Sequence, residues 1–468
     1  MFAGISISGL VLFNMFRDSV ESARAAEVNP LFIAPFIALL ASIALMPFVN
    51  DNWWKKNYPL VAYALGFAVV IYYLIGLKNS SRMLLTLYEY VSFVSLIGSL
   101  FVVAGGIHIS VRGRATPWEN LRLFSIGALL ANIVGTTGAS MILIRPFLRM
   151  NKHRIRPYHV VFFIFVVSNI GGSLTPIGDP PLFLGYLKGI PFFWIVGRVW
   201  EIWLITLVLL FAVFYMIDRR SFLRASKEVQ LSAEQHDTFS VSGISNLFFL
   251  MIILGAVFIQ HSAPLGLREV IMWSAALASY FTTKQEIHER NEFNFHPIKE
   301  VAILFAGIFA TMVPALDWLE KNAAQVGISS VGQFYWGSGI LSSVLDNAPT
   351  YLNFLSAAFG VHGASLGNTQ HVRAMIDLGS PESLGLSNPI RDGAMMITVE
   401  SWRYVQAISI GAVFFGAMTY IGNGPNFMVR SIAEHTHVKC PSFLEYVYRY
   451  SIPILLPIFA LIWFLFFR

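Results

Sequence analysis

The chain has 468 residues, of which 56% are hydrophobic and only 12% are charged, and its formal net charge is +6. Soluble proteins carry roughly 25% charged residues, so this composition excludes an ordinary soluble domain and indicates an integral membrane protein. The positive charge does not indicate nucleic-acid binding, because excess Lys and Arg in a membrane protein usually reports topology. The single cysteine, Cys440, excludes an intrachain disulfide, a cysteine-based zinc site and an iron–sulfur centre.

Residues 1–29 allow two interpretations. Residues 4–16 form an apolar run that is short for a bilayer crossing, and residues 23–26 include the small side chains typical of a signal-cleavage site. No basic residue precedes the run, so an interfacial helix is an equally good interpretation. The sequence therefore predicts either a signal segment or an interfacial segment here.

Ten apolar segments have the length of a bilayer crossing. They lie near 31–49, 59–77, 84–107, 158–190, 198–217, 244–261, 264–283, 298–316, 402–436 and 451–467. Two more, 121–148 and 333–359, carry polar residues at their centres, and we interpret them as re-entrant helical hairpins. With this assignment most of the 32 Lys and Arg fall on one side, which should be cytoplasmic. The loop 360–401 is then external. If each hairpin were a full crossing instead, every later segment would change direction.

Two of the crossing segments are interrupted by matching nine-residue sequences. Thr175-Pro-Ile-Gly-Asp-Pro-Pro-Leu-Phe183 and Thr419-Tyr-Ile-Gly-Asn-Gly-Pro-Asn-Phe427 share Thr, Ile, Gly, Pro and Phe at equivalent positions. Proline lacks an amide donor and clashes with the preceding turn, so neither segment can be a continuous helix. Backbone freed in this way is tolerated at membrane depth only inside protein or beside a wet cavity. Paired breaks of this kind indicate the substrate site of a transporter.

The broken helices belong to an internal repeat. An Ala-Gly pair, a polar hairpin centre and a broken helix occur in the same order in both halves, and an odd number of crossings separates equivalent marks. The sequence therefore predicts an all-α polytopic membrane protein with an inverted-topology repeat, residues 30–230 and 231–468. Each repeat contains one re-entrant hairpin and one broken helix. The alternative is that these Gly and Pro residues only ease helix packing.

Polar side chains at membrane depth gather at the four interruptions. Half-helix ends at such breaks expose amides and carbonyls of opposite partial charge, so the backbone alone favours neither an anion nor a cation. The candidates for binding an ion or substrate are Asn132, Thr136, Thr137, Ser168, Asn169, Thr175, Asp179, Asp346, Asn347, Thr350, Thr419 and Asn423.

Two of these candidates, Asp179 and Asp346, are acidic. A carboxylate at membrane depth is costly and therefore a functional candidate. Sodium and a proton would compete for one such carboxylate, which is the simplest physical basis for antiport. Asp179 could instead cap the helix that begins at Pro180, whereas Pro349 makes the tip that carries Asp346 irregular and favours a functional role there. The sodium candidates are Asp179, Asp346, Asn169 and Asn423.

Other polar residues are expected at span ends. We expect Arg145 to extend to the cytoplasmic interface, Glu89 and His108 to flank the third span, and Asp317 and Glu320 to lie just beyond the eighth. The sequence contains no Walker motif and no nucleophile–base motif, so it supports neither an ATP-driven pump nor an intramembrane enzyme.

Two motifs resemble a known group of carriers. Asn169-Ile-Gly-Gly-Ser-Leu-Thr-Pro-Ile-Gly-Asp179, followed by Pro-Pro, resembles the first unwound helix of the ion transporter superfamily, and Asp346-Asn-Ala-Pro349 resembles its second hairpin tip. That group includes NhaD-type sodium/proton antiporters, arsenite permeases and citrate or dicarboxylate carriers. The Pro-Pro pair is more similar to the arsenite and carboxylate branches, although Ile170 replaces the Thr of the Ser-Asn-Thr triplets of dicarboxylate carriers.

The resemblance implies a scaffold domain, often dimerising, and a transport domain that moves like an elevator in the bacterial inner membrane. Membrane lipid, a small ion or carboxylate and a second copy of the chain would be the partners. By motif position, the resemblance implies that Asn132, Asn169, Thr175, Asp346, Asn347, Thr350 and Asn423 surround the ion.

Three functions are compatible with these patterns. The first is a cation/proton antiporter, most simply sodium against protons, with no cofactor besides the coupling ions. The second is a sodium- or proton-coupled carrier of citrate-like carboxylates. The third is a non-transporting membrane scaffold or sensor, which the duplicated breaks disfavour.

Overall fold

The computed structural model describes residues 25–111, 115–225, 227, 239–259, 264, 266–379, 396–398 and 400–468. The predicted signal or interfacial segment therefore lies almost entirely outside the described residues, as does the middle of the loop 360–401. Within the described part of the chain, helices dominate, and two short antiparallel strands pair, β1 (His108–Val111) with β2 (Phe239–Ser242). Eight of the described helices are long and apolar enough to cross a membrane. The prediction of an all-α polytopic membrane protein is confirmed.

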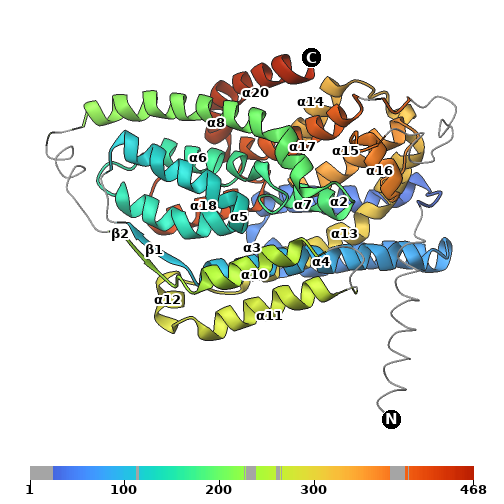
Figure 1. Cartoon of the computed structure of the whole chain (residues 1–468), viewed down its shortest axis with the longest axis horizontal. Coiled ribbons are helices and arrows are strands. Elements are labelled where there is room, and N and C mark those ends of the chain that lie inside the picture. Colours follow the sequence, from blue (N-terminus) through green and yellow to red (C-terminus); the bar gives the residue numbers. More distant parts are fainter. Residues whose placement is uncertain are drawn as a thin grey trace, which may run out of the picture.

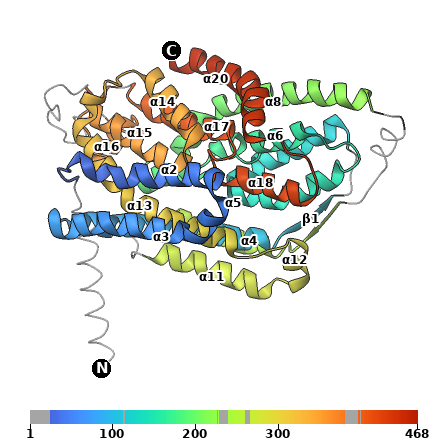
Figure 2. The same cartoon turned by 180° about the vertical axis from the view of Figure 1, so that it is seen from behind.

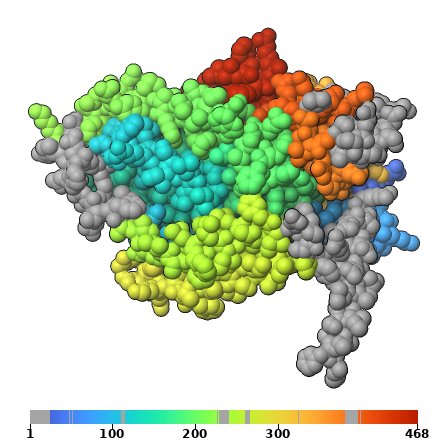
Figure 3. All heavy atoms as spheres, in the orientation of Figure 1, coloured from blue at the N-terminus to red at the C-terminus, as the bar shows by residue number. Residues whose placement is uncertain are grey.

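One group of helices packs side by side, and most of its members lie in the lower half of Figure 1. Its members are α2 (Ala34–Val49), α3 (Asp51–Ile71), α4 (Ser80–Gly105), α10 (Asn246–Val257), α11 (Leu267–Thr282) and α13 (His296–Asn322). Asn50 and Asn79 begin α3 and α4 by accepting hydrogen bonds from backbone amides of the first turn. Helices α10 and α11 have 12 and 16 residues, shorter than the crossings predicted for these segments. In Figure 3, which has the orientation of Figure 1, the surface of α11 lies below that of α10.

The second group contains the predicted hairpins and broken helices. Its members are α5 (Pro117–Met150), α6 (Pro157–Val166), α7 (Pro180–Leu187), α14 (Val331–Val344), α15 (Asn347–Val361), α17 (Trp402–Phe415) and α18 (Gly424–His435). Short 3-10 turns, η3 (Ile170–Leu174) and η5 (Gly416–Met418), lie inside the two breaks. Helix α18 packs against α5, and Figure 2 shows the two helices in the view from behind.

Helix α5 folds back on itself. Its 34 residues would span about 51 Å as a straight helix. Instead, Gly135 adopts φ 77° and ψ 158°, a conformation that glycine adopts readily, and the chain reverses there. The side chains of Asn120 and Asn151, at opposite ends of α5, consequently meet at 2.8 Å. The segment is thus a helical hairpin, and its re-entrant course in a bilayer stays a prediction.

The second hairpin consists of α14 and α15, joined by residues 345 and 346. The Ser330 hydroxyl and the Gln333 side chain form a capping box that starts α14. The rings of Phe334 and Phe354 meet between the arms, with centroids 6.3 Å apart. The two arms therefore pack antiparallel, and their shared tip faces the breaks.

Helix α8 (Phe192–Leu223) runs along the upper side of the hairpin in Figure 1, beside α20 (Leu456–Ile462) at the C-terminus. Near its end, the fully buried Asp218 accepts two hydrogen bonds of 2.6 Å from Arg154 and one of 2.7 Å from Tyr158. Asn120 of the hairpin donates a further bond of 3.1 Å. This group of residues, the Asp218 cluster, connects α8 to the base of the first hairpin and to α6.

Several short segments complete the described chain. They are η1 (Pro30–Ile33), η2 (Tyr72–Gly76), α12 (Gln285–Arg290), η4 (Ala323–Val326), α16 (Thr369–Met375), α19 (Phe443–Tyr446), η6 (Val447–Leu455) and η7 (Trp463–Phe467).

Two acids that the sequence placed near span ends are buried in ion pairs. Asp317, near the end of α13, is fully buried and forms an ion pair of 2.8 Å with Arg82 of α4. Glu89 is also buried and forms an ion pair of 2.6 Å with Lys188, which follows α7. The sequence could not reveal these pairs because their members are 235 and 99 residues apart. Each pair satisfies a charge that would otherwise be costly to bury.

Candidate functional site

Four half-helices begin at one point in the interior. They are the second arm of α5, which starts after Gly135, and the helices α7, α15 and α18. The residues at or directly before their first positions, Thr136, Asp179, Asn347 and Asn423, are all buried, and the other three donate hydrogen bonds to Asp179. Because a helix N-terminus carries about half a positive charge, four of them favour a negative group at this point.

Asp179 is the negative group at the centre of this site. Its Oδ1 atom accepts hydrogen bonds from Thr136 Oγ1 at 3.0 Å and Asn423 Nδ2 at 3.1 Å, and its Oδ2 atom accepts one from Asn347 Nδ2 at 2.8 Å. The carboxylate is 1% exposed. Both hairpin tips and the second break therefore converge on this single carboxylate, and the described structure gives it no salt bridge to a cationic side chain.

The two acids have different surroundings. Asp346 is half-buried at the start of α15, and its Oδ1 atom accepts a hydrogen bond of 3.0 Å from the Ala348 amide, so it caps that helix. Asp179 precedes α7, but its carboxylate bonds none of the amides of α7. The capping interpretation considered for Asp179 thus applies to Asp346, and the geometry puts Asp179 at the centre.

An amide network joins the two broken helices. Asn169 Nδ2 donates to Asn426 Oδ1 at 2.6 Å, and Asn423 Nδ2 lies 3.2 Å from both Asn169 Oδ1 and the Ser168 carbonyl. Asn426 also donates to the carbonyls of Gly416 and Thr419 at 2.8 Å. Asn426 lies in the second nine-residue sequence, which already marks it in the sequence as a polar residue of this break.

Other candidates hold the hairpin tips against the breaks. Thr175 donates to the carbonyl of Asn132 in the first hairpin, and Thr419 donates to the carbonyl of Ser343 in the second, at 2.7 and 2.5 Å. Asn132 Oδ1 accepts from the amides of Leu174 and Thr175. The hydrogen bonds of Asn132, Thr175 and Thr419 are thus made to backbone and fix the shape of the site.

Three candidates remain, and none of their side chains forms a hydrogen bond with Asp179 in the described structure. Ser168 shares a hydrogen bond of 2.8 Å with Ser140 of the first hairpin. Thr350 donates to the carbonyl of Asp346 at 2.9 Å, and Thr137 is half-buried directly after Thr136.

One oxygen in the site has no partner. Asn347 Oδ1 is buried without a hydrogen bond, while Nδ2 of the same side chain binds Asp179. A free amide oxygen beside a carboxylate is a suitable pair of ligands for a hard cation such as sodium. The described residues include no group of three or more His, Cys, Asp or Glu side chains that could hold a transition metal.

The breaks depend on close backbone contacts at equivalent glycines. A Cβ atom at Gly178 would lie 1.9 Å from the carbonyl oxygen of Gly172, and one at Gly422 would lie 2.6 Å from that of Gly416. Neither approach leaves room for a side chain, because the obstructing atom is backbone.

We expect Gly178→Ala to lower the free energy of unfolding by about 1–3 kcal/mol, the usual cost of overpacking, and to abolish transport. Gly424→Ala is the matched control, because nothing lies within 4 Å of its Cβ position, and it should change stability by less than about 0.5 kcal/mol. Chemical unfolding in detergent measures both variants. Equal effects at the two positions would contradict the close-packed break.

Residues 25–467 match a protein-family model, CitMHS_2, described as "Putative citrate transport". The chain belongs to the CitMHS_2 family. No curated protein matched the chain in a sequence search. Membership of a transporter family over nearly the whole chain indicates a secondary transporter that crosses the membrane several times, rather than an enzyme. It agrees with the citrate-carrier part of the resemblance.

Proposed function

We propose that this CitMHS_2 protein is a cation-coupled carrier of citrate-like carboxylates, and that Asp179 binds the coupling sodium ion or proton. The observation that carries the proposal is the buried carboxylate of Asp179, held by neutral donors from both hairpins and the second break. The description of the family favours a carboxylate substrate over a cation as the only cargo.

Charge explains why the two solutes would move together. Two negative charges 4 Å apart repel each other by about 4 kcal/mol at an effective dielectric constant of 20. A citrate carboxylate therefore cannot settle beside an ionised Asp179. A proton or sodium ion on Asp179 removes this repulsion and weakens the hold of Thr136, Asn347 and Asn423 on the acid. Their donors and the four helix N-termini then become available to the substrate anion.

Sodium/proton antiport is the second candidate. It is favoured by the pairing of Asp179 with neutral amides, since one carboxylate can exchange a proton for sodium without an organic substrate. In either case the two hairpins and two breaks would move as a transport domain of elevator type, in a homodimer in the bacterial inner membrane, as the resemblance implies.

Reconstitution distinguishes the two candidates. Purified protein in liposomes is given labelled citrate under an inward sodium gradient, an inward proton gradient, or neither, with the membrane potential clamped. Citrate accumulation that requires one of the gradients supports the carrier. Sodium-dependent proton movement in the absence of citrate, without citrate accumulation, supports the antiporter and refutes the carrier.

Asp346 should contribute little to coupling. We expect Asp346→Asn to retain gradient-driven uptake and to change stability by less than about 0.5 kcal/mol, because Asn caps a helix as well as Asp does. Asp346→Ala should cost about 1 kcal/mol through loss of the cap. Uptake and unfolding of both variants are the measurements, and loss of coupling in Asp346→Asn would assign the ion to Asp346.

A further inference from the structure

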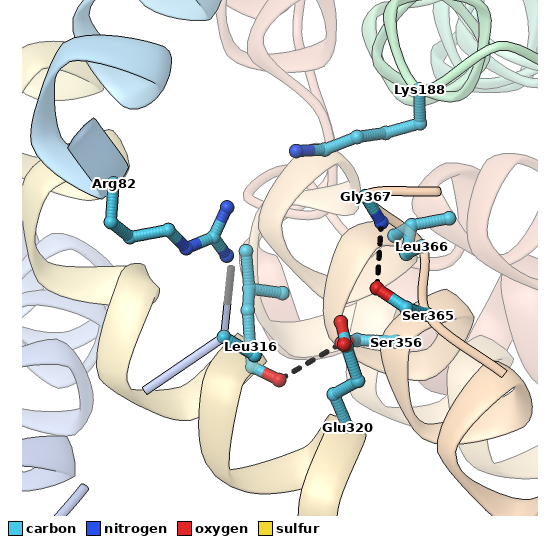
Figure 4. Close-up of a pocket in the computed structure, with 9 residues that line it drawn as sticks. Arg82, Lys188, Leu316, Glu320, Ser356, Ser365, Leu366 and Gly367 are labelled. Carbon is cyan, nitrogen blue, oxygen red and sulfur yellow. Dashed lines mark hydrogen bonds between the residues drawn. The ribbon is translucent and has the colours of Figure 1, made fainter. Parts of the chain in front are cut away.

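A small polar cavity lies where the end of α13 meets α4 and α7 (Figure 4). Arg82 and Lys188 point toward it from two sides, and Glu320 faces them from α13. Arg82 is bound to Asp317 at 2.8 Å and Lys188 to Glu89 at 2.6 Å. These five residues form one cluster, because the charges of Glu89, Asp317 and Glu320 act on Arg82 and that of Lys188 acts on Glu320.

The cluster is not neutral. When all three acids are ionised, three carboxylates face two cationic side chains, so the five described side chains carry one negative charge in excess. Asp317 is fully buried, so solvent does not screen its charge. Arg82 binds Oδ1 of Asp317, and a second cation at Oδ2 of the same carboxylate would balance the excess negative charge of the cluster.

The backbone nitrogen of Ala26 already occupies the position of such a cation. It donates a hydrogen bond of 3.0 Å to Asp317 Oδ2, the same atom that Tyr73 binds at 2.9 Å. Ala25 lines the cavity directly before it. The segment is held in place, because Asn29 bonds the Tyr72 hydroxyl and Val28 packs against Tyr73 and its neighbours.

The sequence before Ala26 reads Ala23-Arg24-Ala25, with small residues one and three positions before the Ala25–Ala26 bond. This spacing is typical of signal-peptide cleavage, and an apolar run precedes it at residues 4–16. The family match begins at residue 25. The distribution of Lys and Arg predicts that this end of α13 is external, the side on which signal peptidases act.

We propose that a signal peptidase cleaves the chain between Ala25 and Ala26, and that the new α-ammonium group of Ala26 forms a buried ion pair with Asp317. Water supplies the oxygen that leaves with Ala25 as a carboxylate, and the nitrogen of Ala26 takes up protons to become the ammonium. Cleavage occurs before the segment packs. The new charge brings the cluster to neutrality and turns a single amide hydrogen bond into a charge-assisted one.

The N-terminus of the mature protein tests the cleavage. The full chain with a C-terminal tag is purified from bacterial membranes and analysed by intact mass and N-terminal sequencing. We expect a chain that begins Ala26-Glu27-Val28. Retention of residues 1–25, or a start at another residue, overturns the proposal. Ala25→Leu should block cleavage. Arg24→Ala should leave cleavage unchanged, because the peptidase selects small side chains only one and three positions before the cleaved bond.

Amine labelling tests the ion pair. In the folded protein, acetic anhydride should modify the exposed Lys56 fully while the α-amine of Ala26 stays at least about ten times less reactive. Asp317→Asn should remove this protection, and Asp377→Asn, at an exposed acid, should not. An α-amine of Ala26 that reacts as fast as Lys56 in the wild-type protein overturns the pairing. That wild-type comparison decides the matter even if Asp317→Asn fails to fold.

Discussion

Asp179→Asn should abolish gradient-driven accumulation of citrate, lowering it by at least about 100-fold, which corresponds to about 2.7 kcal/mol. Asparagine has the shape of aspartate but cannot exchange a proton or sodium ion. It therefore imitates the neutralised state of the site permanently. Since the carrier would still bind citrate in that state, exchange of external for internal citrate should persist in the variant.

Counterflow and accumulation must be measured on the same liposomes. Asp346→Asn is the matched control, because it removes a nearby charge from the cap of α15 and leaves Asp179 intact. If Asp179→Asn still accumulates citrate against its gradient, Asp179 does not bind the coupling ion. If both accumulation and counterflow disappear while the protein stays folded, Asp179 has a role in binding the substrate as well.

Asp218→Asn should have the largest effect on stability, about 3–5 kcal/mol, which is typical of removing one member of a buried ion pair. The substitution leaves Arg154, 7% exposed, without the carboxylate that it binds through two hydrogen bonds of 2.6 Å. Tyr158 and Asn120 lose a charged acceptor at the same time. Denaturant unfolding in detergent gives the free energy.

Two comparisons show whether the uncompensated charge is the cause. The double variant Arg154→Met/Asp218→Asn should be more stable than Asp218→Asn alone, because it no longer buries a lone cation. Glu119→Gln removes an acid from the exposed pair with Arg122 and should cost less than about 1 kcal/mol. If Asp218→Asn lowers the free energy of unfolding as little as Glu119→Gln does, the Asp218 cluster does not stabilise the fold.

The positions of the hairpins and breaks could be predicted because their signals are local. Pro180 and Pro425, which follow Asp179 and Asn423, prevent a helix from running continuously through either break, and a new helix has its first turn at each proline. The meeting of Asp179 with Asn423 followed from the repeated sequence, and the structure brings these side chains to 3.1 Å.

The different surroundings of the acids could not be predicted, because they depend on contacts between distant segments. Asn347, which binds Asp179, is 168 residues away in the chain. The Asp218 cluster could not be predicted from the sequence for the same reason. Asp218 precedes Arg219 and Arg220 at the end of a span, where a charge is usually solvated, and its partner Arg154 lies 64 residues earlier.

The short helix α7 has a mechanical consequence. It contains eight residues, about 12 Å of helix, with Asp179 before its first turn and Lys188 after its last. Lys188 forms an ion pair with Glu89 on α4, so α7 connects Asp179, the proposed ion ligand, to α4. A displacement of the carboxylate along the axis of α7 would therefore be transmitted to this ion pair and to α4.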